Sequence, residues 1–415
     1  MTFEGYRHGE PGFRRVAVAL FAGSFASFGL LYNIQPLLPG FSRDFQISAS
    51  TAALSISFAT ITLGIALLFA GQISEVIGRT VMMRWSTVAA ALVTAATALT
   101  PSWGWLLALR ALAGLLLAGF PAVAMAYLRE EVHPSSHVRA TGLYIGGTAL
   151  GGMIGRLVAG GFAQAGDWRW AIAGSAGYGL LCAGVVLATL PDSRNFHPAP
   201  RSFRSSMRSF VGVLLDPTLL GLYAIGGLVM GSYVAIFNIT GFRLESAPYL
   251  LPVGIAGLIY LVNPIGAVSS IVAGRYAERF GRRAVVPIGF VVAITGVLLT
   301  LAGPLWLFVA GLAVVTVGFF VVHGVVSGWV AARAYLGHRS TGSAAAVYLF
   351  SYYLGGSVLG TVAGTAWRHG GWTTLVAGTL IALSLGLVVS LLVRRTAAFA
   401  PPTSSLTRTT GTTAP

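Results

Sequence analysis

Two arginines interrupt stretches of sequence that are otherwise apolar. Arg156 lies in "ALGGMIGRLVAGG" (149–161), and Arg110 lies in "LALRALAG" of the apolar run before it. A guanidinium near the middle of a bilayer costs about 3 kcal/mol on insertion scales, so it must face the inside of a helix bundle. The glycines around Arg156 would let a second helix approach closely. We predict that both arginines line a polar cavity; the alternative is a structural ion pair that closes one end of the bundle.

Uncharged polar and aromatic side chains fall at similar depths in other apolar runs. They could hydrogen-bond a solute or stack on it, although the same side chains also join helices to one another. Asn33 and Asn238 stand in the related triplets "YNI" and "FNI", so they would face each other across a cavity between repeated halves. Besides the two arginines, the predicted cavity residues are Tyr32, Asn33, Gln35, Asn238, Asn263, Tyr352 and Tyr353.

Proton transfer needs a side chain that titrates, and histidine has the ordinary pKa nearest to neutral. His323 is the only histidine inside an apolar run, and no Asp or Glu occupies the middle of any run. We predict His323 as the first candidate for proton coupling and Arg110 as the second. The alternative is a satisfied core histidine. Asp44 and Glu245, at the ends of runs, are the next candidates.

The composition places these residues in a membrane protein. The chain has 415 residues, 55% of them hydrophobic and 9% charged, with a mean hydropathy of +0.80. All 26 basic residues are arginine, and the absence of lysine excludes a P-loop phosphate site and a Schiff-base cofactor. The sequence contains no HExxH, no GxSxG and no cluster of metal ligands. We predict no enzyme activity, no cofactor and no metal; the scattered charge of +15 does not indicate nucleic-acid binding.

Twelve apolar runs are each near the ~20 residues that cross a bilayer as a helix. Cytoplasmic connections carry an excess of basic residues. With the N-terminus inside, 20 of the 26 arginines fall on the cytoplasmic side, which predicts that both termini are cytoplasmic. The predicted fold is an all-α membrane protein with spans at 16–38, 50–72, 80–99, 103–127, 140–164, 168–190, 211–242, 250–274, 284–302, 305–331, 342–366 and 372–393.

An internal repeat divides the chain. "GQISEVIGR" from Gly71 and "GRYAERFGR" from Gly274 share Gly, Glu, Gly and Arg at one spacing and lie 203 residues apart. Because further pairs keep nearly that displacement across six spans, we predict two pseudo-symmetric six-helix bundles. The predicted division is an N-terminal tail 1–15, a first bundle 16–190, a basic linker 191–210, a second bundle 211–393 and a C-terminal tail 394–415.

The repeated glycine-and-charge loop resembles the signature of the major facilitator superfamily between spans two and three. Its residues are Gly71, Glu75, Gly78 and Arg79, with a weaker copy at Gly274, Glu278, Gly281 and Arg282. Glu75 stands where the family usually has Asp, and Val76 where a basic residue is common. Glu75 could pair with Arg79 or cap the start of span eleven, near 341–343. We interpret the loop as a cytoplasmic latch that stabilises the outward-facing state; the alternative is a turn with no gating role.

Four further stretches resemble the YnfM-type branch of bacterial inner-membrane transporters: "GGMIGRL", "FNITGFRL", "GFFVVHGVVSGW" and "YLFSYYLGGS". Drug/proton antiporters generally have Gly-Pro where this chain has Gly155-Arg156. The resemblance implies a monomeric inner-membrane transporter that exports small solutes, drug-like compounds or sugars, at the expense of a proton gradient. The alternatives are uptake of a sugar or organic anion by symport and, more remotely, a membrane enzyme or a passive channel.

Overall fold

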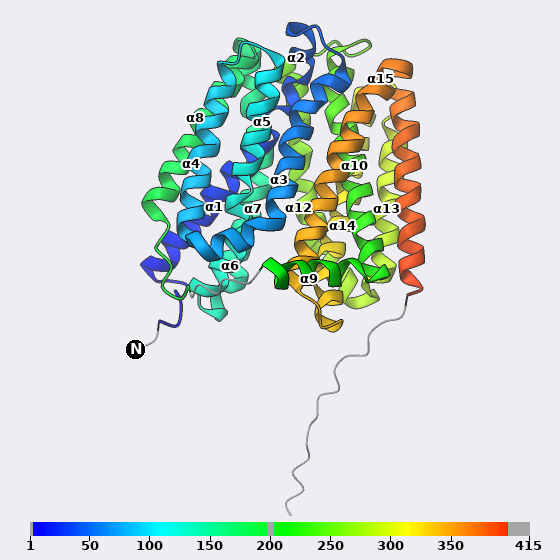
Figure 1. The fold of residues 1–415 in the computed structure, drawn as a ribbon. Coiled ribbons are helices and arrows are strands. Elements are labelled where there is room, and N and C mark those ends of the chain that lie inside the picture. Colours follow the sequence, from blue (N-terminus) through cyan, green and yellow to red (C-terminus); the bar gives the residue numbers. More distant parts are fainter. Residues whose placement is uncertain (1–2, 197–202, 397–415) are drawn as a thin grey trace, which may run out of the picture.

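The computed structural model describes residues 3–196 and 203–396. Within these residues the chain is helical, with one isolated β-bridge between Tyr6 and Val132. The helices stand side by side as a bundle (Figure 1). The first half contains α1 (Pro11–Tyr32), the 3-10 turn η1 (Gln35–Leu37), α2 (Leu38–Asp44), α3 (Ala49–Ile77), α4 (Arg79–Ala98), α5 (Trp103–Leu117), α6 (Gly119–Glu131), the 3-10 turn η2 (Pro134–Ser136), α7 (His137–Ala165) and α8 (Trp168–Thr189).

The second half follows a short helix, α9 (Phe203–Leu214). Its elements are α10 (Pro217–Glu245), α11 (Val253–Gly257), the 3-10 turn η3 (Leu258–Val262), α12 (Asn263–Phe280), α13 (Arg282–Leu299), α14 (Leu305–Leu336) and α15 (Thr341–Arg394). Inside α15, Gly370 and Gly371 leave helical geometry, and Gly371 has a φ of 62°. Glycine tolerates this conformation at no steric cost, so α15 is two helices joined by a sharp bend.

Ten segments of the described chain are long and apolar enough to cross a membrane. One of them is α15, which contributes two crossings. The 29-residue α7, rich in glycine and containing Arg156, completes the expected set of twelve spans. The all-helical fold predicted from the sequence is therefore confirmed.

The ends of the helices follow from local sequence. Gly78 and Gly281 separate α3 from α4 and α12 from α13, with φ values of 92° and 85°. These are the paired glycines of the repeated loop, and both need the left-handed backbone region that glycine favours. The side chains of Asp167, Asp216 and Ser340 accept hydrogen bonds from the first backbone N–H groups of α8, α10 and α15.

Several predicted boundaries differ from the structure by a few residues, and two of the differences have a clear local cause. The first helix begins at Pro11 rather than residue 16, since proline suits the first helical position. The second bundle begins at Pro217 rather than residue 211, because Asp216 and Pro217 start a new helix there. Residues 211–214 belong to α9, which lies across one face of the bundle (Figure 1). Residues 197–202 of the predicted linker and 397–415 of the predicted C-terminal tail lie outside the described residues.

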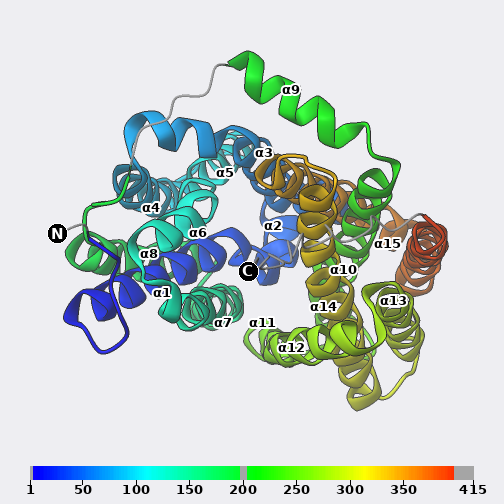
Figure 2. The ribbon, with the colours of Figure 1, turned by 90° about the horizontal axis from the view of Figure 1, so that it is seen from below.

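Seen along the helices, α1 and α3–α8 form one group and α10 and α12–α15 form the other (Figure 2). Both ends of the described chain lie on one face, which we call the terminal face (Figure 1). The opposite face, which carries α2, is called the distal face (Figure 1). Contacts between the groups come chiefly from α3 with α15 and from α7 with α11 and α12.

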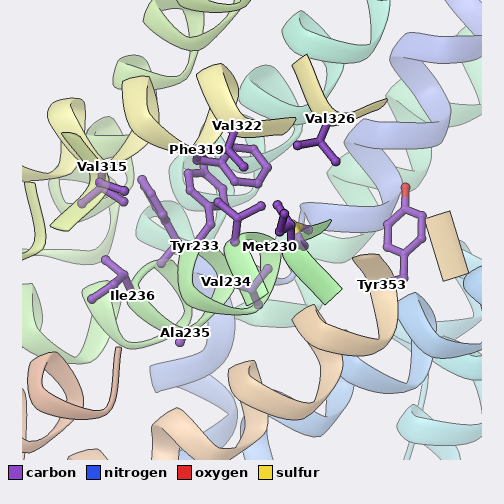
Figure 3. Packing of buried hydrophobic residues seen from close by; sticks show 14 of the residues in the cluster. Met230, Tyr233, Val234, Ala235, Ile236, Val315, Phe319, Val322, Val326 and Tyr353 are labelled. Carbon is purple, nitrogen blue, oxygen red and sulfur yellow. The ribbon is translucent and has the colours of Figure 1, made fainter. Parts of the chain in front are cut away.

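An aromatic and aliphatic core fills the second half. Tyr233 of α10 and Phe319 of α14 have ring centroids 4.2 Å apart at an interplanar angle of 21°. Figure 3 shows these two rings together, with Val315 and Val322 beside them and Tyr353 on another helix. The same buried cluster continues to Tyr32 of the first half, so apolar packing reaches across the boundary between the groups.

Candidate functional site

Arg110 is enclosed within the first half and is 1% exposed. Its guanidinium donates hydrogen bonds to three backbone carbonyls, those of Ser55 at 3.2 Å, Leu30 at 3.2 Å and Leu31 at 2.8 Å. The last carbonyls of a helix have no partner within it, and those of Leu30 and Leu31 are among the last of α1, which ends at Tyr32. Arg110 therefore stabilises the end of α1, and it does not face a cavity in this conformation.

Arg156 forms part of a hydrogen-bonded chain between the halves. Its Nε donates to Gln35 Oε1 at 2.6 Å, and its Nη1 donates to the Gly152 carbonyl at 2.6 Å. Gln35 Nε2 donates in turn to Asn238 Oδ1 at 2.8 Å. This series of hydrogen bonds ends at Gly360, whose carbonyl accepts a hydrogen bond from Asn238 Nδ2 at 3.4 Å. Four spans, the first, fifth, seventh and eleventh, are thus joined by polar side chains.

Aromatic rings cover the guanidinium of Arg156. Its Cζ lies 4.5 Å from the ring centroid of Tyr32 and 5.0 Å from that of Tyr260. Such cation–π contacts stabilise a buried arginine without neutralising it. Tyr260 was not among the residues predicted from the sequence. It lies in the short 3-10 turn η3, and no pattern in the sequence predicts this turn.

A second layer of contacts closes the distal face above this chain. Arg43 Nη1 and Glu245 Oε2 are 2.8 Å apart across the halves, and the backbone N–H of Gly254 donates to Gln164 Oε1 at 3.1 Å. A small pocket nearby is lined by both halves, including Pro36, Glu245 and Tyr260. Asp44 accepts a hydrogen bond from Trp168 Nε1 at 2.6 Å. We call the two layers together the distal seal.

Contacts between α3 and α15 continue from the distal seal to mid-span and then end. Ser57 Oγ lies 2.8 Å from Thr361 Oγ1, and Thr60 Oγ1 lies 2.7 Å from Ser357 Oγ. One turn further on, a Cβ placed on Gly64 would lie 3.2 Å from Tyr353 Cβ, whereas at Gly71 it would meet nothing within 4 Å. The hydrogen bonds and the ion pair that join the halves in the described part of the chain thus lie between mid-span and the distal face.

His323 belongs to a cluster of aromatic rings on α14 and α15. Its Nδ1 lies 2.9 Å from the hydroxyl of Tyr348, and its ring is 4.8 Å from that of Tyr352. It also stacks on Phe319, with centroids 5.8 Å apart and an interplanar angle of 1°. His323 and Tyr352 are half-buried. Within the described residues, neither carries an ion pair with an acid.

The remaining predicted cavity residues, Asn263, Tyr353 and Asn33, lie in different surroundings. Asn263 accepts a hydrogen bond from the hydroxyl of Tyr233 at 3.0 Å, and Tyr353 is buried at 4% exposure beside Tyr352. Asn33 is fully buried, and neither its Nδ2 nor its Oδ1 has a hydrogen-bond partner among the described residues. The structure thus brings Tyr32, Gln35, Arg156 and Asn238 together. Arg110 binds backbone carbonyls instead, and Asn33 makes no hydrogen bond with this group.

The glycine-and-charge loop makes different contacts from those predicted. The ion pair of Arg79 is with Glu130 at the end of α6, at 2.8 Å, rather than with Glu75. A second hydrogen bond joins Arg79 Nη1 to Ser74 Oγ at 2.7 Å. Glu75 has no partner among the described residues, and the start of α15 is capped by its own Ser340. Because Gly78 ends α3 between them, Glu75 and Arg79 are not one helical turn apart, and Arg79 begins α4.

The second half uses another ion pair at the terminal face. Asp216 is 1% exposed and pairs with Arg333 at the end of α14 and with Arg339, each at 3.1 Å. Burial by itself would raise the pKa of the Asp216 carboxyl, but the hydrogen bonds from Arg333 and from backbone N–H groups of α10 outweigh it and hold that pKa below its usual value. The ion pairs of Glu130 and Asp216 were not predicted from the sequence, because each joins helices that are distant in the chain.

These features define a class of protein. Two similar six-span bundles, which meet through polar side chains at mid-depth and are closed on one face only, are the architecture of a secondary membrane transporter. The chain belongs to the Major Facilitator Superfamily, whose family model matches residues 20–269. It is accordingly a multi-pass membrane transporter and not an enzyme.

Named relatives cover nearly the whole chain. The inner membrane transport protein YnfM of Escherichia coli is 40% identical over 93% of this chain and 91% of its own length. The MFS-type transporter YybF of Bacillus subtilis is 37% identical over 92% of this chain and 94% of its own. The resemblance to the YnfM-type branch is thereby confirmed.

Solved structures share the fold at low identity. A bacterial homologue of the human lysosomal transporter Spinster, in an inward-facing and occupied conformation, superposes with a TM-score of 0.77 at 16% identity, covering 94% of this chain and 98% of that one. A D-xylose–proton symporter superposes with a TM-score of 0.71 at 16% identity, covering 94% and 98%.

Proposed function

We propose that this transporter exports small solutes from the bacterial cytoplasm in exchange for protons. It would act as a monomer in the inner membrane, with both termini in the cytoplasm. The arginine-rich terminal face supports this orientation. In this orientation the structure is inward-facing, and the distal seal closes the periplasmic side.

The observation that carries the proposal is the chain Arg156–Gln35–Asn238. It crosses from one half to the other, so it must break when the distal face opens. Alternating access requires such a contact, strong enough to close one face yet made of few bonds. A solute that enters from the terminal face would pass Tyr352 and His323 before it reached these three hydrogen-bonded side chains.

His323 is the proposed proton carrier. It lies within a span, it is half-buried on the open side, and it is hydrogen-bonded to a neutral tyrosine rather than to an acid. The acids Asp44 and Glu245 are each engaged at the distal seal. Arg110, the other coupling candidate, keeps its three carbonyl partners in this conformation and is proposed as a structural support of α1 instead.

Uptake of an organic anion by symport is the second candidate, because Arg156 has no acidic partner within the described residues and would suit an anionic solute in either direction of transport. The test is a substrate screen in inverted membrane vesicles with an imposed pH gradient. Proton-driven export predicts solute accumulation inside vesicles that are acidic inside, and its collapse when a protonophore is added. Accumulation only under the opposite gradient would assign symport, and equilibration without accumulation would assign a channel.

A further inference from the structure

The formal charges at mid-membrane are all positive. The eleven acidic residues of the sequence lie at helix ends or in connections, so they leave Arg110 and Arg156 as the charges inside the spans. Arg110 gives its hydrogen bonds to three carbonyls. Arg156 is therefore the cation that remains for a solute.

Arg156 is held in place but is not neutralised. Its Nε and Nη1 have neutral acceptors, whereas its Nη2 has no hydrogen-bond partner among the described residues. The side chain is 5% exposed and lies between two tyrosine rings. A buried charge without a counter-ion is costly, and an anion placed against it lowers that cost.

A continuous series of rings leads from Arg156 toward the open face. Tyr260, whose ring lies 5.0 Å from the Arg156 guanidinium, stacks on Phe237, and Phe237 lies against Tyr233. Tyr233 stacks on Phe319, which stacks in turn on His323. Tyr352 lies beside His323, with ring centroids 4.8 Å apart. His323 and Tyr352 are both half-buried. Flat rings that keep part of their surface exposed are suited to stack on a planar apolar group.

We propose that the central site binds an organic anion with an aromatic body, its carboxylate on Arg156 and its ring against Tyr352 and His323. This inference rests on the proposed transport function but is independent of its direction and of the coupling ion. Cations are disfavoured because two arginines and no acid lie at this depth. A sugar offers neither the charge for Arg156 nor the flat face for the rings.

The test compares three ligands of one shape on the purified full-length protein at pH 7, by isothermal titration calorimetry. They are 2-naphthoate, the cationic 2-naphthylmethylamine, and decahydro-2-naphthoate, which keeps the carboxylate but loses the aromatic ring. We expect naphthoate to bind at least about tenfold more tightly than the amine, as a charge-assisted hydrogen bond allows. It should bind about threefold more tightly than the saturated acid, as ring stacking allows.

Two variants assign the contacts. Arg156→Gln should weaken naphthoate binding about tenfold, whereas Arg139→Gln, an exposed position on the same helix, should leave it unchanged. Tyr352→Leu should reduce the preference for naphthoate over the saturated acid. The wild-type comparison stands without either variant if one fails to fold.

Failure of naphthoate to bind the wild-type protein, or binding of the amine as tight as that of naphthoate, would overturn the inference. Equal binding by the Arg156→Gln and Arg139→Gln proteins would also overturn it. The transport function is tested separately, because the vesicle screen can find a cationic or neutral substrate even when naphthoate does not bind.

Discussion

Two arginines that look alike in the sequence have different roles in the structure. Both lie in apolar runs at similar depth, and for both the sequence predicts a place inside the bundle. It cannot predict that Arg110 turns to the carbonyls of a broken helix, because span four is apolar on all sides and its rotation has no signature. The glycines around Arg156 made its place inside the bundle predictable. Its hydrogen bond with Gln35 was not predictable, because Gln35 is positioned by the 3-10 turn that contains Pro36.

Arg110→Met should destabilise the protein. The substitution leaves the buried carbonyls of Leu30 and Leu31 at the end of α1 without a donor, each worth about 1 to 3 kcal/mol. We expect a clear fall in the thermal unfolding midpoint of the purified protein. Arg139→Met, on an exposed turn of α7, is the control and should unfold at the wild-type temperature. An unchanged midpoint for Arg110→Met would show that water or other side chains satisfy the end of α1.

His323→Ala should abolish uphill transport and retain exchange. Removal of the imidazole deletes the proposed proton carrier but leaves the chain Arg156–Gln35–Asn238 intact. The assay uses proteoliposomes, with a substrate identified in the vesicle screen, and compares gradient-driven accumulation with counterflow. His369→Ala, which alters an exposed histidine, should keep both activities. Accumulation at the wild-type rate in His323→Ala would move the proton site to Asp44 or Glu245.

At the scale of the elements, the sequence predicts the spans well and their interruptions poorly. Hydropathy finds the crossings because each must be apolar over its length. It cannot separate α9 from α10, since residues 211–214 are apolar although they belong to a helix on the terminal face. The paired loop glycines were predictable because a tight turn in the left-handed region has a glycine signature, whereas the partner of Arg79 was not.

Close packing of α1 against α7 depends on glycine. A Cβ at Gly151 would lie 2.6 Å from Phe25 Cα, and at Gly146 of the same helix it would meet nothing within 4 Å. Gly151→Val should therefore push α7 from α1 and cost about 1 to 3 kcal/mol or more. Gly146→Val should be neutral. The measurement is the yield of monodisperse protein and its unfolding midpoint; equal results for the two variants would contradict the packing.

Glu75→Gln should shift the population toward the inward-facing state and lower transport, with expression largely intact. Glu75 has no partner in the inward-facing structure, so the substitution costs nothing there and weakens only the proposed outward-facing latch. The readout is periplasmic labelling of Ala256→Cys, a buried position of the distal seal, in a Cys182→Ser background. Labelling should fall with Glu75→Gln and change less with Glu278→Gln. Undiminished labelling would remove the gating role.

At the scale of the molecule, the division into two bundles followed from a repeat displaced by 203 residues, and the family model and relatives agree with it. The conformational state could not be predicted. It depends on a few bonds between the halves, such as Arg43 with Glu245, and one sequence must form the contacts of both states. The inward-facing arrangement is therefore a property of the whole bundle rather than of any motif.

The central claim is that the halves close one face as they open the other, and paired distances measure this most directly. Spin labels at exposed positions Gln46 and Ser246 report on the distal face, and labels at Val138 and Tyr335 report on the terminal face. Pulsed electron resonance on both pairs, with and without a transported solute and across pH, should show the distal distance lengthening as the terminal distance shortens. Distances that stay fixed, or that lengthen together, would contradict alternating access.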